Sequence, residues 1–274
     1  GNIAAANIAI DYNIQGPSFT VSTACSSGGD AINTACMCMQ SGKADIMLAV
    51  GAESVLCPLV IYSLANAKAL SRRNDSPSTA SRPFDVTRDG FVIGEGGGAL
   101  VLETEEHALA RGAKIYAEIR GCGNTDDAYH VTAPHPEGRG AIACMKQAIA
   151  EAGINPSDIG YINAHGTATN KGDTVETSSI KKVFGNTLPY VSSTKGATGH
   201  MMGAGGITET ITCVKAIETG TVPPTINLNE VDPECAGIDF VANTAKKAEI
   251  NFAMSNAFGF GGQNSSIIVG KYGK

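Results

Sequence analysis

The sequence lacks tryptophan altogether, and aromatic residues make up only 5% of its 274 positions. No apolar run reaches the roughly 18 residues that a membrane-spanning helix needs, so a membrane-spanning protein is not predicted. The first residues, 1–4, have neither a basic flank nor a small-residue cleavage pattern, so no secretory signal is predicted. These absences together predict a cytoplasmic protein that does not associate with membranes.

Long runs of like charge are also missing. The chain has 20 lysines and arginines against 26 aspartates and glutamates, which gives a net charge of −6 at pH 7. Broad binding to nucleic acid requires a basic face, so a nucleic-acid partner is not predicted. With 43% hydrophobic and 17% charged residues, the composition is that of a globular protein with one large domain or two small ones.

Cysteine and glycine, in contrast, are well represented. The 8 cysteines are scattered, mostly within apolar patterns, so reduced thiols are a better interpretation than disulfides. Cys36 and Cys38 form a C-x-C pair within a helical pattern. Positions i and i+2 of a helix do not share a face, and no histidine lies near the pair in the sequence, so no metal site is predicted there. The 33 glycines suggest tight turns and close packing of small residues.

Apolar segments of strand and helix character alternate along the chain, which predicts a layered α/β fold. Strands are predicted over residues 18–22, 44–52, 98–103, 114–121, 159–166 and 188–196. Helices are predicted from residue 26 onward and over 58–70, 105–112, 140–153, 173–184 and 200–218, with a polar loop over 71–85. The final segment, 253–272, has the pattern of a hairpin with a glycine-rich bend.

The glycine cluster GEGGGA, at residues 94–99, partly matches a dinucleotide-binding pattern. The functional version of that pattern must follow a strand and open a helix. Here the glycines lead into the apolar run at residues 100–102. A glycine-rich strand that packs closely against its neighbours is therefore the better interpretation.

Four short stretches that end strand patterns contain reactive or positioning groups: 23–27, 163–167, 194–200 and 256–262. Because ligands of α/β sheets tend to bind beyond the carboxyl ends of the strands, these stretches could converge on one pocket. In the first of them, Cys25 stands close to the predicted start of a helix. The first N–H groups and the dipole of that helix would favour a nucleophilic thiolate, and a buried structural cysteine is the alternative.

The other three stretches supply candidate partners for this thiol. His165 and His200 each follow a predicted strand and stand beside a glycine, which allows close approach of a substrate. Lys195 lies at a strand end, where a cation could orient a neighbouring group. The FGFGG segment offers backbone amides that could stabilise an oxyanion. Taken singly, these features have plainer alternatives, namely a hydrogen-bonded structural histidine, a solvated lysine and a tight hairpin turn.

Eight longer motifs span nearly the whole chain. In order they are GPSFTVSTACSSG, SRPFDVTRDGFVIGEGGGALVLE, RGAKIYAEIRG, DAYHVTAP, INAHGTAT, VSSTKGATGHMMGAGG, VPPTINL and SNAFGFGGQN. Together they resemble the β-ketoacyl-(acyl-carrier-protein) synthases, the condensing enzymes of fatty-acid synthesis, and most closely the type called synthase II. The resemblance implies a thiolase-like fold, a duplicated α-β-α-β-α arrangement that is incomplete at the N-terminus. It also implies that residues 1–274 form one catalytic region, made of the rear part of the first half-fold and the complete second half-fold.

Carried over position by position, the resemblance assigns roles within all four stretches. Cys25 would accept the acyl group, and His165 and His200 would assist decarboxylation and condensation, supported by Lys195. The backbone N–H groups of Cys25 and Phe260 would form an oxyanion hole, and Phe260 would also gate the acyl pocket. The remaining roles are substrate binding for Thr167, Thr169 and Phe258, a structural role for Glu209, and a monovalent-cation set of Asn163, Glu209, Ser255 and Asn256.

The activity that the resemblance implies is a decarboxylative Claisen condensation. Malonyl-acyl-carrier protein would react with an acyl group held on Cys25 and so elongate a fatty acid. The implied partners are the carrier protein, whose phosphopantetheine makes a further cofactor unnecessary, and a second copy of the chain, paired through the strand at 18–22. Because the chain is acidic overall, docking of an acidic carrier needs a local basic patch, and Lys68, Arg72 and Arg73 are the candidates.

Three alternatives stay open from the sequence. A polyketide ketosynthase would share the fold and the motifs. A non-catalytic partner chain, or a remnant lacking the front segment of the family, would share the fold, but the intact Cys25, His165 and His200 argue against a chain-length-factor role. A thiolase that uses coenzyme A substrates fits the pattern of two histidines poorly.

Overall fold

The computed structural model describes residues 1–273. Its helices are α1 (Ile3–Tyr12), α2 (Ser27–Gln40), α3 (Pro58–Asn66), α4 (Glu105–Ala110), α5 (Arg139–Ala152), α6 (Asn170–Phe184), α7 (Lys195–Thr198) and α8 (Gly205–Thr219). The strands are β1 (Ile46–Glu53), β2 (Gly96–Glu103), β3 (Glu118–Asp126), β4 (Ile159–Asn163), β5 (Tyr190–Ser192), β6 (Thr221–Val222), β7 (Asp239–Phe240), β8 (Lys246–Lys247), β9 (Phe252–Phe258) and β10 (Gln263–Gly270). The predicted alternation of helices and strands is confirmed.

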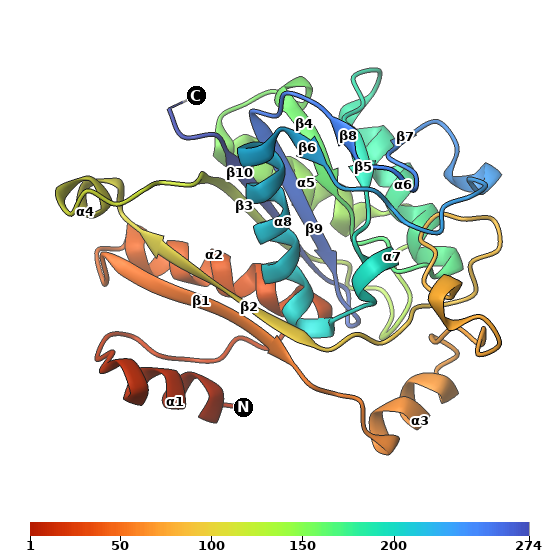
Figure 1. Cartoon of the computed structure of the whole chain (residues 1–274), viewed down its shortest axis with the longest axis horizontal. Coiled ribbons are helices and arrows are strands. Elements are labelled where there is room, and N and C mark those ends of the chain that lie inside the picture. The colour runs from red at the N-terminus through yellow and green to blue at the C-terminus, as the bar shows by residue number, and fades with distance from the viewer. Residues whose placement is uncertain (274) are drawn as a thin grey trace.

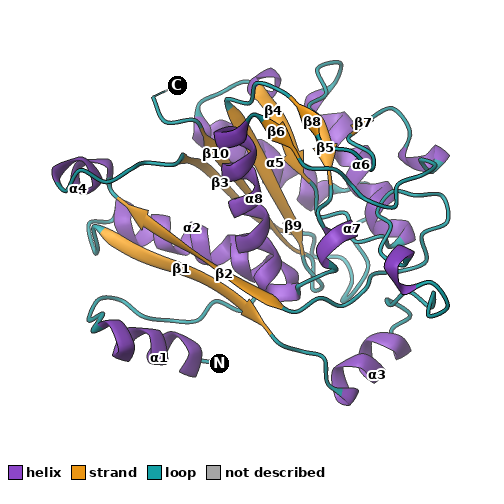
Figure 2. Ribbon diagram, in the orientation of Figure 1, coloured by secondary structure: helices purple, strands orange, loops and turns teal. Residues whose placement is uncertain are grey.

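The main sheet has six strands in the order β3-β10-β9-β4-β5-β7 (Figures 1 and 2). Strands β3, β10 and β9 are antiparallel, whereas β9, β4, β5 and β7 run parallel to one another. The predicted hairpin is β9–β10, in which Asn264 pairs with Phe258 next to the bend. A second, smaller sheet consists of antiparallel β1 and β2, and β6 pairs with β8.

Helices cover both faces of the main sheet, which explains why its central strands are apolar on both sides. Successive strand residues point to opposite faces. Accordingly, Tyr161 and Ile267 join the core formed with α2 and α8, while their neighbours Ile162 and Ile268 join the core formed with α5 and α6. Helices α2 and α8 also pack against β1 and β2, so they fill the space between the two sheets (Figure 1).

Glycines allow α2 and α8 to approach each other very closely near their N-terminal ends. A Cβ atom on Gly28 would lie 2.7 Å from the backbone nitrogen of Ile207, and one on Gly206 would lie 2.4 Å from that of Gly29. Both distances are shorter than real Cβ contacts, so larger residues would force the helices apart. This crossing confirms the expected close packing of small residues, and it places the start of α2 beside the segment that precedes α8.

Several predicted elements differ from the structure. The strand predicted over 114–121 begins only at Glu118 and runs to Asp126, and the one predicted over 188–196 ends at Ser192, before α7 begins at Lys195. Residues 18–22 form no strand, because no other segment within residues 1–273 pairs with them. The helix predicted to end at residue 70 ends at Asn66, since Lys68 adopts a left-handed backbone (φ 55°) and the chain then pairs with Phe91. The helix predicted from residue 200 begins at Gly205, after a short turn at Met202–Ala204.

The outer face of the β1–β2 sheet is open to solvent. Val101 of β2 is 63% exposed, and α1, which lies on this side in Figure 1, has no buried residue. The described residues therefore form four packed layers: the small sheet, α2 with α8, the main sheet, and α5 with α6. None of the helices described is both long and apolar enough to cross a membrane.

Candidate active site

Cys25 lies in a tight turn, Ala24–Ser26, that leads directly into α2. Ala24 has a left-handed backbone (φ 51°), which is unfavourable for a residue with a Cβ and is often found at functional sites. The hydroxyl of Ser27 donates to the carbonyl of Ala24 at 2.7 Å and accepts from the backbone N–H of Thr23 at 2.9 Å. These bonds hold the turn in the conformation that presents the thiol.

Asp30 is a buried carboxylate that fixes the same turn. Its Oδ2 accepts hydrogen bonds from the hydroxyls of Thr23, at 2.5 Å, and Ser26, at 3.2 Å, while its Oδ1 accepts from the side-chain amide of Asn124 at 2.7 Å. This residue was not identified from the sequence. The S-x-x-D pattern of Ser27 and Asp30, which resembles a helix-capping sequence, was a signal that could have identified it.

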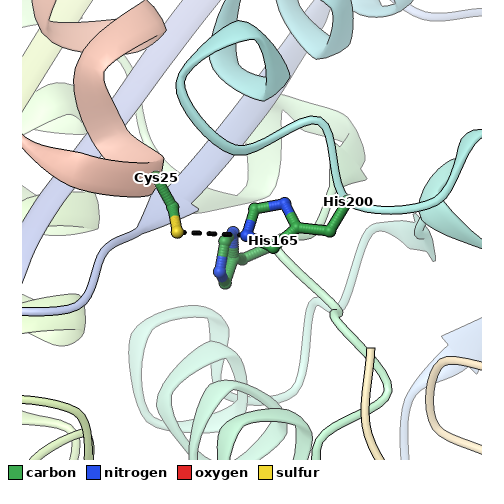
Figure 3. A group of neighbouring side chains, drawn as sticks. All are labelled: Cys25, His165 and His200. Carbon is green, nitrogen blue, oxygen red and sulfur yellow. Dashed lines mark hydrogen bonds between the residues drawn. The ribbon is translucent and has the colours of Figure 1, made fainter. Parts of the chain in front are cut away.

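The two histidines meet the thiol in one cavity, as Figure 3 shows. His200 Nε2 and Cys25 Sγ lie 3.0 Å apart, and the tautomer of the imidazole decides which atom donates. The rings of His165 and His200 meet edge to face, with centroids 5.3 Å apart. The structure thus brings together three residues that are far apart in the sequence and that were predicted to act together.

The backbone of His200 is held by a bridge to Ile93. The N–H of His200 donates to the carbonyl of Val92 at 2.7 Å, and its carbonyl accepts from the N–H of Gly94 at 2.9 Å. The ring of Phe91 packs edge-on against the imidazole, with centroids 5.2 Å apart. Residues 91–94, which lead into the glycine-rich strand, therefore also support His200 from one side.

His165 lies on the loop after β4, and a second buried acid holds that loop. Glu176 of α6 accepts from the backbone N–H of His165 at 2.9 Å and from that of Gly166 at 2.8 Å. Asp173, one turn earlier, accepts from the N–H of Ala168 at 3.1 Å. Neither acid was identified from the sequence, where two acids three residues apart in the helix after a histidine loop were the available signal.

Lys195 and Glu209 form a buried ion pair behind the histidines. Burial, with the charge of Lys195 as a second cause, holds the pKa of His165 and of His200 well below the ordinary value, so both rings are neutral. Among residues 1–273, the Nδ1 atom of neither ring has a hydrogen-bond partner. An unpaired buried N–H is less readily tolerated than an unpaired acceptor, which favours the tautomer with the proton on Nε2.

The expectation of a lowered thiol pKa at Cys25 is wrong for this structure. Burial raises the pKa of Cys25 to about 11, and this effect outweighs the lowering by the backbone N–H of Phe260 and by Lys195. The side chain is buried by walls that come from several distant segments, so the helix N-terminus acts against a large desolvation cost. At neutral pH the resting group is the thiol, and the thiolate forms only with help from its neighbours.

The cavity around Cys25 has a volume of about 350 Å³, and its walls are mostly apolar. The predicted substrate-binding and gating residues Thr167, Thr169, Phe258 and Phe260 all line it. The FGFGG bend presses against the nucleophile turn. A Cβ on Gly259 would lie 2.9 Å from the carbonyl oxygen of Thr23 and 3.2 Å from the nitrogen of Cys25. This contact places the bend that carries Phe260 directly beside the turn of Cys25, and the oxyanion hole formed by their N–H groups stays a prediction.

The predicted cation set is only partly free to bind an ion. Asn256 Oδ1 already accepts from the Ser266 hydroxyl at 2.8 Å, and one oxygen of Glu209 is taken by Lys195. The Oδ1 of Asn163 and the Oε2 of Glu209 are buried without a partner among residues 1–273. Two of the predicted ligand residues therefore fit a cation, and the site stays a prediction.

The predicted basic patch is smaller than expected. Lys68 and Arg72 are exposed, but the guanidinium of half-buried Arg73 donates to the carbonyl of Thr87 at 2.9 Å. Asp89 lies alongside, since its carboxylate accepts from the hydroxyl of Ser71 and from the backbone N–H of Arg72. Only two of the three cations are thus free to contact a partner.

A layered α/β fold with a cysteine at the start of a buried helix, and two histidines on loops that face it, is the architecture of thiolase-like condensing enzymes. Matches to family models assign the chain to a narrower group within this class. Residues 1–108 match the family model "Beta-ketoacyl synthase, N-terminal domain", and residues 116–229 match "Beta-ketoacyl synthase, C-terminal domain". The chain belongs to the β-ketoacyl synthase family.

Similar proteins of known name span bacteria and plants. The chain is 48% identical, over 99% of its length, to 3-oxoacyl-(acyl-carrier-protein) synthase 2 of Rhizobium meliloti, and it covers 65% of that protein. It is 46% identical to the mitochondrial 3-oxoacyl-(acyl-carrier-protein) synthase of Arabidopsis thaliana over 97% of the chain and 59% of that protein. The chain thus spans somewhat less than two thirds of the length of these relatives.

Solved structures share the fold closely. A ketosynthase described as bound to a hexaketide and in complex with its type II polyketide-synthase acyl-carrier protein has a TM-score of 0.96 and 38% identity, over 98% of this chain and 67% of that one. A β-ketoacyl synthase of Burkholderia phymatum has a TM-score of 0.94 and 39% identity, over 98% of this chain and 65% of that one. The predicted thiolase-like fold is confirmed.

The Glu176→Gln variant is expected to be less stable by about 1–3 kcal/mol, because the amide offers one acceptor oxygen to two buried N–H groups. The loss should be larger at pH 5 than at pH 8. Burial raises the pKa of Glu176 from 4.5 to about 7. The folded protein therefore binds a proton on this carboxyl more tightly than the unfolded chain does. The stability that this proton contributes is lost as the pH rises towards 7. Denaturant unfolding of both proteins at the two pH values measures this.

Glu249→Gln, at an exposed position, is the matched control and should change stability little at either pH. An equal loss for Glu176→Gln at pH 5 and pH 8 would show that the carboxyl of Glu176 is not held protonated by burial.

Proposed function

We propose that this chain carries the catalytic site of a β-ketoacyl-(acyl-carrier-protein) synthase that elongates fatty acids by decarboxylative Claisen condensation. The observation that carries the proposal is the meeting of Cys25 Sγ, 3.0 Å from His200 Nε2, with His165 in one mostly apolar cavity. The names of the bacterial and plant relatives support the choice of substrate.

In the first step, Cys25 attacks the thioester carbonyl of an acyl-carrier protein. The thiol gives up its proton to solvent, a bond forms between Sγ and the acyl carbon, and the bond from that carbon to the carrier sulfur breaks. The carrier leaves as a thiolate that takes up a proton from solvent. Nε2–H of His200 stabilises the attacking thiolate by donating to it, which offsets part of the desolvation cost. The backbone N–H groups of Cys25 and Phe260 would donate to the oxyanion of the tetrahedral intermediate.

In the second step, malonyl-carrier protein loses carbon dioxide, and the electron pair of the broken C–C bond passes into an enolate. Nε2–H groups of His165 and His200 donate to the enolate oxygen as negative charge develops. The enolate carbon then attacks the acyl carbon on Cys25, and the thiolate leaves. The products are carbon dioxide and the β-ketoacyl-carrier protein, and the Cys25 thiolate takes up a proton from solvent, which restores the resting thiol.

The partners follow from this reaction. The carrier protein brings both acyl groups on its phosphopantetheine, for which the cavity walls at Thr167 and Thr169 are the proposed contacts, and we propose no other organic cofactor. We also propose a homodimer, in which the mostly exposed residues 18–22 gain the strand partner that they lack within one chain. The proposed location is the cytoplasm, although the name of the Arabidopsis relative places that enzyme in mitochondria.

A polyketide ketosynthase is the second candidate. It is favoured by the TM-score of 0.96 to a ketosynthase described as bound to a hexaketide. The two functions differ in product rather than in site chemistry. Repeated condensation without reduction of the β-keto group would give a polyketide, whereas a single condensation per acyl group is the fatty-acid reaction.

The test is a reaction of the purified protein with an acyl-carrier protein and malonyl-carrier protein, followed by intact mass spectrometry. We expect an acyl adduct on Cys25 first, and then a carrier product heavier by one two-carbon unit with a single keto group. Products that grow by several two-carbon units would support the polyketide candidate. The absence of both the adduct and the product in a folded protein would contradict either function for this chain.

Reversal of charge at Lys68 and Arg72, by Lys68→Glu with Arg72→Glu, is expected to weaken carrier binding by roughly three- to tenfold at low salt. The reason is slower association, because opposite charges across an interface mainly steer encounter. The loss should shrink as salt rises, since exposed charges are screened within about 8 Å at physiological ionic strength. Stopped-flow binding of a fluorescent carrier protein measures the association rate.

Lys43→Glu with Lys271→Glu changes the net charge equally at two other exposed positions and serves as the matched control. Turnover of a short soluble thioester that lacks the carrier should stay the same in both double variants. Unchanged carrier association at low salt for the Lys68 and Arg72 variant would show that the carrier docks elsewhere.

A further inference from the structure

The proposed catalytic residues also form a set of soft metal ligands. The sulfur of Cys25 and one ring nitrogen each of His165 and His200 all lie within 4.8 Å of one another (Figure 3). In a tetrahedral zinc site, bonds of about 2.0–2.3 Å place neighbouring ligand atoms roughly 3.3–3.6 Å apart. Small side-chain rotations would therefore bring the three atoms to the distances that one ion requires.

We propose that Cys25, His165 and His200 bind a thiophilic divalent cation of the zinc class, and that this ion reversibly blocks the site. On binding, the Cys25 thiol releases its proton to solvent and a metal–sulfur bond forms, while each imidazole gives the lone pair of one ring nitrogen. For His200 this nitrogen is Nε2, which faces the sulfur, so its ring proton moves to Nδ1. The inhibitory consequence rests on the proposed function, whereas the binding itself does not. The ion is an inhibitor in this proposal and takes no part in condensation.

The ligand types select the class of ion. Thiolate and imidazole suit zinc, cobalt and related metals, whereas magnesium and calcium require oxygen ligands. Lys195 is the charged group behind the histidines, and Glu209 neutralises it in a buried ion pair, so the ion does not face an uncompensated positive charge. One thiolate and two neutral ligands then hold the dication.

The cavity leaves the fourth position open. Three protein ligands with a fourth position for water or substrate is the arrangement of catalytic zinc sites, and the cavity of about 350 Å³ has room for such a ligand. If the carrier thiol enters this cavity, it could complete the coordination. Product carrier would then strengthen the block rather than relieve it.

The surroundings of the histidines set the strength of binding. In dedicated metal sites the second ring nitrogen of a ligating histidine usually donates to a carboxylate or carbonyl, and loss of such a partner typically weakens metal binding by about 10–100-fold. Here the Nδ1 atoms of His165 and His200 have no partner within residues 1–273. The structure therefore favours reversible inhibition by free metal over a permanently bound ion.

The test is titration of the purified protein with cobalt(II), without oxygen and without any carrier or acyl substrate, followed by competition with zinc(II). We expect one equivalent of cobalt, a near-ultraviolet thiolate-to-metal absorption band, and the visible intensity of a four-coordinate ion. Cys25→Ser should lose the band, and His165→Ala and His200→Ala should each weaken binding by roughly tenfold or more. Circular dichroism verifies that each variant is folded.

Cys57→Ser and His107→Ala, which remove an exposed thiol and an imidazole that does not line the cavity, are the matched controls and should bind cobalt as the parent does. A band that persists in Cys25→Ser, or that disappears in Cys57→Ser, would overturn the proposal, as would failure to bind cobalt at all. Metal protection of Cys25 against iodoacetamide, mapped by peptide mass, is a second readout. Because neither readout uses turnover, failure of the metal proposal is distinguishable from failure of the proposed condensation.

Discussion

Replacement of Cys25 by alanine is expected to eliminate the acyl-enzyme and to reduce condensation by on the order of 10³-fold or more, as loss of a covalent nucleophile does in other enzymes. The thioester links the two half-reactions, and none of the other described cysteines lies with the two histidines in the cavity. Intact mass after incubation with acyl-carrier protein, and product formation after addition of malonyl-carrier protein, measure the two losses.

The Cys25→Ala variant also distinguishes the role of the cysteine in acylation from the role of the two histidines in decarboxylation. His165 and His200 remain in Cys25→Ala, so malonyl-carrier protein should still lose carbon dioxide in the absence of an acyl acceptor. Cys57→Ser, which removes the exposed thiol, is the control and should retain both acylation and condensation. An acyl adduct of normal yield in Cys25→Ala would place the nucleophile at another residue.

Local signals were enough to predict much of the fold. The β9–β10 hairpin follows from two apolar runs joined by glycines, and both its strands and its bend depend on residues close in the sequence. The placement of Cys25, His165 and His200 at the ends of elements also predicted that they would meet, because element ends converge at one edge of a sheet. The structure places them around one cavity, although the strand expected before Cys25 is absent within residues 1–273 and the start of α2 positions the thiol instead.

Features that depend on distant residues could not be predicted in the same way. The pKa of Cys25 is raised because several separate segments exclude water from the thiol, and no local pattern encodes that burial. In the sequence, Glu176 has the pattern of a solvent-exposed acid on a helix. Only the packing of α6 against the loop of His165 shows that its carboxylate is buried and accepts backbone hydrogen bonds. Residues 18–22 have the composition of a strand, but a strand needs a hydrogen-bonding partner, and none is available within residues 1–273.

The two histidines are expected to differ in the step that they support. His165→Ala should keep acylation of Cys25 within about threefold, since His165 is not the residue hydrogen-bonded to the sulfur, but condensation should fall by about 10²–10³-fold, the usual cost of losing one oxyanion donor. His200→Ala should lose condensation to a similar extent and also acylate more slowly, by roughly tenfold. Its Nε2 lies 3.0 Å from Sγ, and without that donor the buried thiolate is less stable.

Rapid-quench mass spectrometry of the acyl-enzyme, alongside the rate of product formation, resolves the two steps for each variant. His107→Ala, in α4 and outside the residues that line the cavity, is the control and should leave both rates unchanged. The pH dependence of Cys25 alkylation also distinguishes the two histidines. His200→Ala should shift the apparent pKa of Cys25 upward, whereas His165→Ala should not. If acylation disappears in His165→Ala but survives in His200→Ala, the thiolate is stabilised by His165 during the reaction, and the 3.0 Å contact with His200 belongs to the resting enzyme alone.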